Sequence, residues 1–139
     1  MEFVKTYGGR EKYFKRANVK DCVVRAICNA TGEDYQKTYN GVRQCQEKFY
    51  RQKGITQGKK ISPRNGVPNE VTKDYIENQI KWKWHPLKNA NILDHKFGKS
   101  TYIVQMKKHL TCIKENKLYD SWDCQNKRDK TVLGYWSKI

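Results

Sequence analysis

The sequence predicts an α+β fold in which N-terminal helices pack on a C-terminal antiparallel sheet. Apolar residues recur at helical spacing in three segments between residues 22 and 80, whereas strand-like segments dominate from Ser100 onward. Helices followed by strands are typical of an α+β fold with an antiparallel sheet. Because domains commonly contain about 100–150 residues, we expect one domain over residues 1–139, with residues 1–20 as a basic N-terminal segment.

Three helices are expected in the first part of the chain. The first covers about residues 22–31, where apolar residues recur at helical spacing and Gly32 follows as a C-terminal stop. The second begins after Asp34, a favourable N-cap residue, and contains Gly41. Glycine costs up to about 1 kcal/mol inside a helix, so we expect a close contact at that position. A glycine-containing loop then leads to a third helix over about residues 68–80.

Strands are expected in the second half of the chain. The segment KWKWHP alternates apolar and basic residues, and Pro86 is expected to end it. Trp82 and Trp84 in this segment are expected to face the core, with stacking on nucleic-acid bases as the alternative. After an irregular connector over residues 89–100, four further strands carry the sequences TYIVQM, HLTCIK, KLYDSW and TVLGYW.

The register of one hairpin can be predicted from its turn. Glu115 and Asn116 form a natural two-residue turn, because asparagine tolerates the positive φ that such turns require. Centring the hairpin there places His109 and Asp120 on the same face as diagonal neighbours, within reach of each other's side chains. Asp123 would point to the opposite face. The register therefore favours Asp120 as the partner of His109.

Cys22 is the candidate nucleophile. It stands at the N-terminus of the first predicted helix, where the helix dipole favours a thiolate and lowers the pKa of the thiol. A cysteine nucleophile needs a histidine base and a group that orients the imidazole, and His109 and Asp120 supply both. His85 and His95 are weaker candidates because the hairpin argument does not apply to them. The alternative is that Cys22 is a small buried apolar residue, as most free cysteines are.

Four segments of the chain resemble a known group of proteins: KDCVVRAICNATGEDY, GVPNEVTKDYIENQIKWKW, STYIVQMKKHLTCIKENKLYDSWD and the final GYW. Together they resemble small papain-like proteins of bacteria and their phages, which are similar to the bacteriocin-processing cysteine peptidases. The resemblance extends from about Asp21 to Trp136. It implies a papain-like fold with Cys22 as nucleophile, His109 as base and Asp120 as orienting acid. It also implies hydrolysis of an amide, peptide or isopeptide bond.

The oxyanion hole departs from the papain-like pattern. Enzymes of that group place a glutamine about half a dozen residues before the cysteine, whereas this chain reads FKRANVK there. Asn18 is the available side-chain amide, and the backbone N–H of Cys22 at the helix start could supply another donor. Arg25, one helical turn after Cys22, could stabilise the thiolate or recognise an acidic substrate group. A surface or ion-pairing role for Arg25 is the alternative.

Charge and cysteine content bear on partners and location. The net charge is +15, from 29 basic and 14 acidic side chains. Such a charge favours nucleic acid or an acidic protein or peptide as partner, and a generic solvated surface is the alternative. The five cysteines are scattered without a C-x-x-C pair, so we expect reduced thiols rather than disulfides or a metal site. The chemistry needs no cofactor.

The expected location is the cytoplasm, which would be that of the bacterial host if a phage encodes the chain. The N-terminal residues lack an apolar core with a cleavage site, and no apolar run is long enough to span a membrane. Two functions remain open at this point. One is a cysteine hydrolase, and the other is a catalytically inactive papain-like protein that binds nucleic acid or an acidic protein through its basic surface, such as a phage inhibitor of a host factor.

Overall fold

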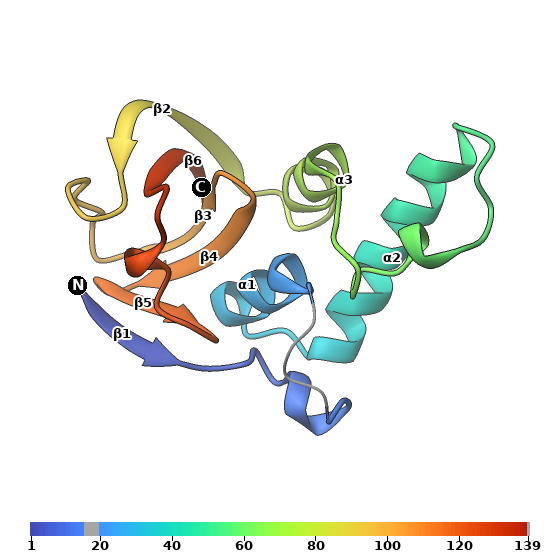
Figure 1. Ribbon diagram of the computed structural model, residues 1–139, viewed down its shortest axis with the longest axis horizontal. Helices are drawn as coiled ribbons and strands as arrows, with labels where there is room; N and C mark the ends of the chain where they lie inside the picture. Colours follow the sequence, from blue (N-terminus) through green and yellow to red (C-terminus); the bar gives the residue numbers. More distant parts are fainter. Residues whose placement is uncertain (16–19, 139) are drawn as a thin grey trace.

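The computed structural model describes residues 1–15 and 20–138 and has an α+β architecture. A six-stranded sheet lies on one side and the helices lie on the other, with α2 farthest from the sheet (Figure 1). The strand order is β1-β5-β4-β3-β6-β2. The strands are β1 (Glu2–Lys5), β2 (Lys83–Asn91), β3 (Thr101–Met106), β4 (His109–Lys114), β5 (Lys117–Asp120) and β6 (Thr131–Ser137).

The sheet is mixed, which corrects the prediction of an antiparallel sheet. Strands β2 to β6 pair antiparallel, but β1 pairs parallel with β5 and places Phe3 opposite Leu118. The predicted basic N-terminal segment thus contributes an edge strand. Its half-buried Phe3 packs against a core cluster that contains Leu118. Only two apolar residues occur in this four-residue strand, so its alternation is too short to be recognised in the sequence.

The three predicted helices are present. Helix α1 (Cys22–Thr31) ends at Gly32, whose φ of 75° requires a residue that tolerates the left-handed region. Helix α2 (Tyr35–Arg51) is capped by Asp34, which accepts a hydrogen bond from the backbone N–H of Lys37 at 3.2 Å. Helix α3 (Asn69–Asp74) continues as a π-helical turn, η3 (Tyr75–Gln79). Short 3₁₀ helices complete the set: η1 (Arg10–Lys12), η2 (Lys59–Ile61) and η4 (Cys124–Asn126).

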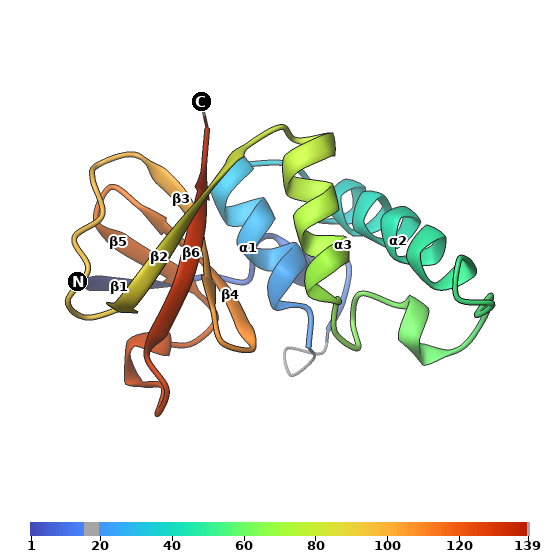
Figure 2. The same ribbon diagram turned by 90° about the horizontal axis from the view of Figure 1, so that it is seen from above.

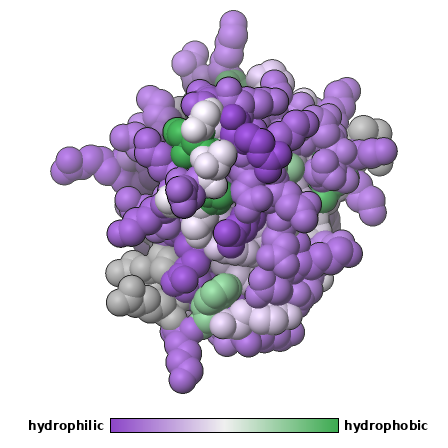
Figure 3. All heavy atoms as spheres, turned by 90° about the vertical axis from the view of Figure 1, so that its right-hand side faces the viewer, coloured by the Kyte–Doolittle hydropathy of each residue, from purple (hydrophilic) through white to green (hydrophobic). Residues whose placement is uncertain are grey.

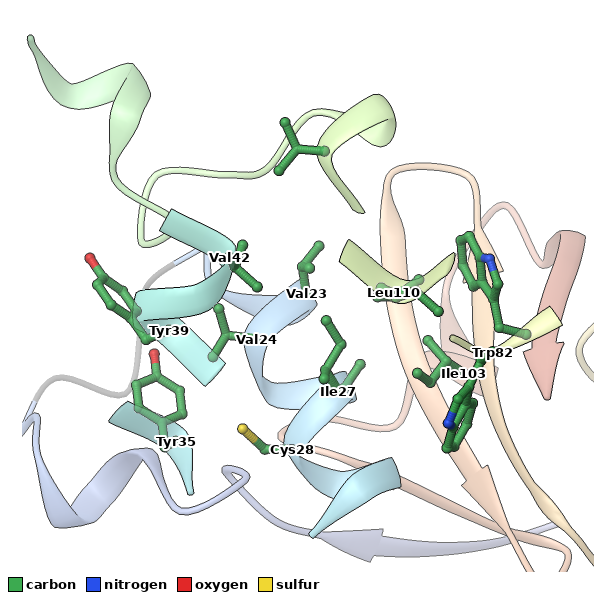
Figure 4. Packing of buried hydrophobic residues seen from close by; sticks show 14 residues of the cluster. Val23, Val24, Ile27, Cys28, Tyr35, Tyr39, Val42, Trp82, Ile103 and Leu110 are labelled. Carbon is green, nitrogen blue, oxygen red and sulfur yellow. The ribbon is translucent and has the colours of Figure 1, made fainter. Parts of the chain in front are cut away.

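Helix α1 lies between the sheet and the other two helices (Figure 2). Its residues Val23, Val24 and Ile27 are buried in one core cluster with Val42 of α2 and Leu110 of β4 (Figure 4). A helix that packs on two sides needs apolar residues around most of its circumference, and the CVVRAIC segment provides them. The N-terminus of α1, and with it Cys22, is thereby held beside the start of β4.

A close contact explains the glycine inside α2. A Cβ at Gly41 would lie 2.8 Å from Cε2 of Tyr75, which is too close for any side chain without displacement of the ring. The predicted close contact is therefore confirmed. It lets α2 and the α3–η3 segment approach each other directly.

Strand β2 continues past Pro86, which corrects the prediction that this proline ends the strand. Proline is tolerated because β2 is an edge strand, which has a strand partner on one side alone. The register shifts between Pro86 and Ala90, and Asn89 has a φ of 51° at this irregularity. Trp82 is buried in the core, and Trp84 packs on Trp136 with ring centroids 4.4 Å apart. Both tryptophans therefore serve the core, as predicted.

The surface formed by α2 and the loop that follows it is mostly hydrophilic. Figure 3 shows this side with only small apolar patches between polar side chains. In the described part of the chain, no helix combines the length and the apolar character that crossing a membrane requires.

Candidate active site

His109 and Asp120 form a buried pair on the predicted hairpin. Glu115 and Asn116 form the turn with φ values of 51° and 61°, and Ile113 lies opposite Leu118 as the predicted register requires. His109 begins β4 and Asp120 ends β5. His109 Nε2 donates a hydrogen bond to Asp120 Oδ2 at 2.7 Å, and both side chains are buried. The predicted pairing of these two residues is thus confirmed.

Cys22 lies against this pair at the first residue of α1. The side chain of Asp21, the N-cap residue, makes no capping hydrogen bond. The helix dipole therefore presents its positive end beside the thiol without a capping carboxylate to offset it. The Cys22 thiol is in hydrogen-bonding contact with the imidazole of His109, whose Nε2 is hydrogen-bonded to Asp120.

The pKa of Cys22 is lowered and that of His109 is raised, so each shift favours the charged form of the side chain. Burial, the strongest influence, raises the pKa of the Cys22 thiol, but a hydrogen bond to His109 and the charges of His109 and Arg25 together lower it below its ordinary value. For His109, burial lowers the pKa, but hydrogen bonds to Asp120 and two thiols raise it to about 11. These opposite shifts favour a thiolate–imidazolium pair.

The other thiols differ from Cys22. Burial raises the pKa of Cys28 to about 11 and that of Cys112 to about 12. It also raises the pKa of the half-buried Cys45. All five cysteines are unpaired. Among the four thiols of Cys22, Cys28, Cys45 and Cys112, that of Cys22 is therefore the one whose surroundings lower its pKa and favour the reactive thiolate form.

Two residues that follow β5 in the chain, Trp122 and Cys124, contact His109. The ring of Trp122 packs against the imidazole, with ring centroids 4.9 Å apart. Cys124 is fully buried, and its thiol contacts His109. Ligand atoms of His109, Asp120 and Cys124 lie within 4.8 Å of one another, a grouping that could hold a metal ion. A metal would have to displace the 2.7 Å hydrogen bond between the first two, so we interpret the group as a hydrogen-bonded pair beside a thiol.

A buried carboxylate anchors the start of α1. Asp21 is fully buried and forms ion pairs with Nε of Arg10 and Nε of Arg25, each at 3.0 Å. The hydroxyl of Tyr35 donates a further hydrogen bond to Asp21 at 2.6 Å. Two buried cations thus share one buried anion directly before Cys22. The sequence suggests only an N-cap role for an aspartate at this position, so this network could not be predicted.

Arg25 links this network to the hairpin. Its Nη1 donates a 2.6 Å hydrogen bond to Ser121 Oγ, and the backbone N–H of Ser121 donates a 2.7 Å hydrogen bond to Asp120 Oδ1. One chain of contacts therefore runs from Asp21 through Arg25 to the carboxylate that holds His109. Arg25 is ion-paired and buried, as the alternative interpretation expected, and it also lowers the pKa of Cys22.

A cleft with a volume of about 470 Å³ opens beside Cys22 and His109. Much of its wall is formed by Gly66, Val67, Asn69, Trp122 and Lys108 of the β3–β4 turn. Gln105 also lines the cleft, but its amide nitrogen already donates to the carbonyl oxygens of Met106 and His109. Asn18, the predicted oxyanion donor, lies outside the described residues.

The two remaining histidines lie away from this cleft. His85 stacks on Tyr135 and hydrogen-bonds to Ser137 Oγ at 2.9 Å. His95 packs edge-on against Phe97 with ring centroids 4.6 Å apart. Neither takes part in the contacts around Cys22.

The chain matches no family model, no curated protein and no solved structure. The resemblance to papain-like proteins therefore stays a hypothesis that rests on the motifs of the chain. The functional argument depends on the geometry around Cys22, His109 and Asp120.

Proposed function

We propose that the protein is a papain-like cysteine hydrolase that cleaves an amide, peptide or isopeptide bond. The observation that carries the proposal is the buried His109–Asp120 hydrogen bond beside a helix N-terminal thiol with a lowered pKa. A nucleophile, a base and an orienting group in this order are what acyl transfer through a thiol needs. A helix that carries the nucleophile and packs on the sheet that carries the base and acid also supports a papain-like arrangement.

In the first half-reaction, the Cys22 thiolate attacks the carbonyl carbon of the substrate and a tetrahedral oxyanion forms. The carbon–nitrogen bond then breaks as the imidazolium of His109 gives its proton to the leaving amine. Asp120 holds the imidazole in the useful tautomer and stabilises its charged form. The products of this step are the free amine and a thioester on Cys22.

In the second half-reaction, neutral His109 removes a proton from a water molecule, and the resulting hydroxide attacks the thioester carbonyl. Collapse of the second tetrahedral oxyanion releases a carboxylic acid and restores the thiolate–imidazolium pair. The backbone N–H groups in the first turn of α1 are suited to stabilising both oxyanions. Asp21 does not cap that turn with its side chain, so these donors are not committed to a cap. Free thiols on all five cysteines suit a reducing compartment such as the cytoplasm.

An activated ester tests this proposal without knowledge of the natural substrate. We expect p-nitrophenyl acetate to acylate Cys22 in a rapid burst and then to turn over as water cleaves the thioester. Intact-protein mass spectrometry identifies the acyl-enzyme, and Cys22→Ala should abolish both phases, whereas Cys45→Ser should preserve them. Acylation no faster than that of a free thiol, or acylation without turnover, would contradict hydrolysis.

The alternative, a non-catalytic binding protein, is supported by a different part of the chain. Residues 35–66, which contain α2 and the loop after it, hold eight lysines and arginines and a single acidic residue, Glu47. Glu47 is itself paired with Arg43 at 2.9 Å. A surface of this kind attracts nucleic acid or acidic proteins. An affinity for oligonucleotides that falls steeply with salt, together with an inert Cys22, would favour this function.

A further inference from the structure

We propose that the cleft beside Cys22 is a subsite for a carboxylate, so that the acyl substrate is a peptide with an acidic side chain close to the bond that is cleaved. This inference rests on the proposed function and specifies its substrate class. Three basic side chains line the cleft: Lys20, Arg25 and Lys108. Within the described part of the chain, the residues that line it include no aspartate or glutamate.

One lysine precedes each member of the Cys22–His109 pair in the chain, and both lysines line the cleft. Lys20 lies two residues before the nucleophile, where its backbone N–H donates to the carbonyl of Arg64 at 3.0 Å. Lys108 lies directly before His109 in the β3–β4 turn, with a φ of 57°. Both side chains are exposed, and among the described residues neither has a carboxylate within ion-pairing distance. Their ammonium groups are therefore free to meet a substrate.

The buried charges beside the cleft add to the positive charge of these lysines. Arg10 and Arg25 share the single carboxylate of Asp21, so this group carries one net positive charge. The thiolate, the imidazolium and Asp120 together carry one net negative charge. With the two free lysines, the site as a whole keeps a surplus of two positive charges. A cleft with low-dielectric walls focuses such a field and favours an anionic ligand.

The chemistry of the nucleophile favours a peptide over a nucleic acid as the source of the negative charge. A thiolate transfers acyl groups, and a peptide supplies an acyl carbon and a carboxylate in one molecule. The cleft volume of about 470 Å³ is within the range of small-ligand sites. It suits a short stretch of peptide with one acidic side chain.

Two alkylating reagents test this subsite, because they share one reactive carbon and differ in charge. Iodoacetate carries a carboxylate, whereas iodoacetamide is neutral. We expect the ratio of their rate constants at Cys22, measured by peptide mapping, to exceed the same ratio for N-acetylcysteine. Raising the ionic strength from about 0.01 M to 1 M shortens the Debye length from about 30 Å to about 3 Å, so the excess should largely disappear.

Neighbouring lysines in one turn provide the matched control. Lys107 and Lys108 both occupy the β3–β4 turn, but Lys107 points to Asp129 at 3.6 Å and does not line the cleft. Lys108→Gln and Lys20→Gln should each lower the iodoacetate-to-iodoacetamide ratio by about two- to fivefold, the effect of one partly solvated charge. Lys107→Gln removes the same charge and should leave the ratio unchanged. An equal effect of Lys107→Gln would assign the preference to overall charge and overturn the subsite.

A protection experiment distinguishes peptide carboxylates from phosphates. We expect poly-glutamate to slow the alkylation of Cys22 by iodoacetamide, and to do so more than a single-stranded oligonucleotide of equal charge. Stronger protection by the oligonucleotide would overturn the choice of an acidic peptide. The absolute rate with iodoacetamide separates the two proposals: a slow rate contradicts the activated thiol, whereas a fast rate with an ordinary ratio contradicts only the carboxylate subsite.

Discussion

The buried ion network around Asp21 gives the sharpest prediction about stability. The substitution Asp21→Asn keeps the size of the side chain and removes its charge. Arg10 and Arg25, whose side chains are only 2% and 8% exposed, would then remain inside the protein without a carboxylate. An uncompensated buried charge is costly because burial removes its hydration.

The expected magnitude follows from this geometry. Removing one partner of a buried ion pair costs about 3–5 kcal/mol, and here one carboxylate serves two cations at 3.0 Å. Since a chain of this size loses about 4 °C in Tm for each kcal/mol, Asp21→Asn should lower Tm by about 12–20 °C. Arg10→Met should cost less, because Asp21 would keep Arg25 and the hydroxyl of Tyr35 as partners.

Urea denaturation followed by tryptophan fluorescence measures these differences in the free energy of unfolding. Glu47→Gln is the matched control, because it removes a carboxylate from the exposed Arg43–Glu47 pair on α2. Such i,i+4 pairs contribute only about 0.3–0.5 kcal/mol. If Asp21→Asn were within about 1 kcal/mol of the wild type, the argument that a shared buried carboxylate anchors α1 would be refuted.

Three further substitutions test separate parts of the account. Asp120→Asn should slow ester turnover by about 10²-fold or more, because the amide cannot stabilise the imidazolium of His109. Steady-state kinetics measures this effect, and a change below threefold would contradict the role of Asp120. Trp122→Ala should lower the free energy of unfolding by about 1 kcal/mol, because it removes the aromatic packing on His109; urea denaturation would detect this loss, and an unchanged stability would contradict the packing role. Gly41→Ala should lower stability by about 1–3 kcal/mol through the clash with Tyr75, whereas a stabilised variant in the same urea assay would contradict the close contact.

Local patterns were sufficient to predict most elements of the fold. Helix α1 follows from the helical spacing of its apolar residues, and its end follows from Gly32, which tolerates the left-handed conformation. The Glu115–Asn116 turn sets the register of the hairpin. The parallel strand β1 could not be predicted, because four residues with two apolar side chains carry no clear period. The passage of β2 through Pro86 depends on its position at the sheet edge, which is a tertiary property.

Only part of the candidate site could likewise be predicted from the sequence. His109 and Asp120 could be paired from the sequence because a hairpin register is a local property. The link from Asp21 through Arg25 to Ser121 joins residues up to a hundred positions apart, so only the packing of α1 against the sheet brings them together. The contact between His109 and the buried Cys124 depends on the course of the chain after β5, and no sequence pattern indicates it.

The most direct test of the central claim is the rate of Cys22 alkylation by iodoacetamide as a function of pH, in the wild type and in His109→Ala. Only the thiolate reacts, so a lowered pKa of Cys22 moves the rise of the rate to lower pH. In His109→Ala, burial acts on the thiol without the opposing imidazolium, and the rise should move above the ordinary pKa of about 8.5. Cys28 and Cys112 should stay unreactive at neutral pH. Coincident curves for wild type and variant, both centred at the ordinary thiol pKa, would contradict the Cys22–His109 pair and the hydrolase proposed from it.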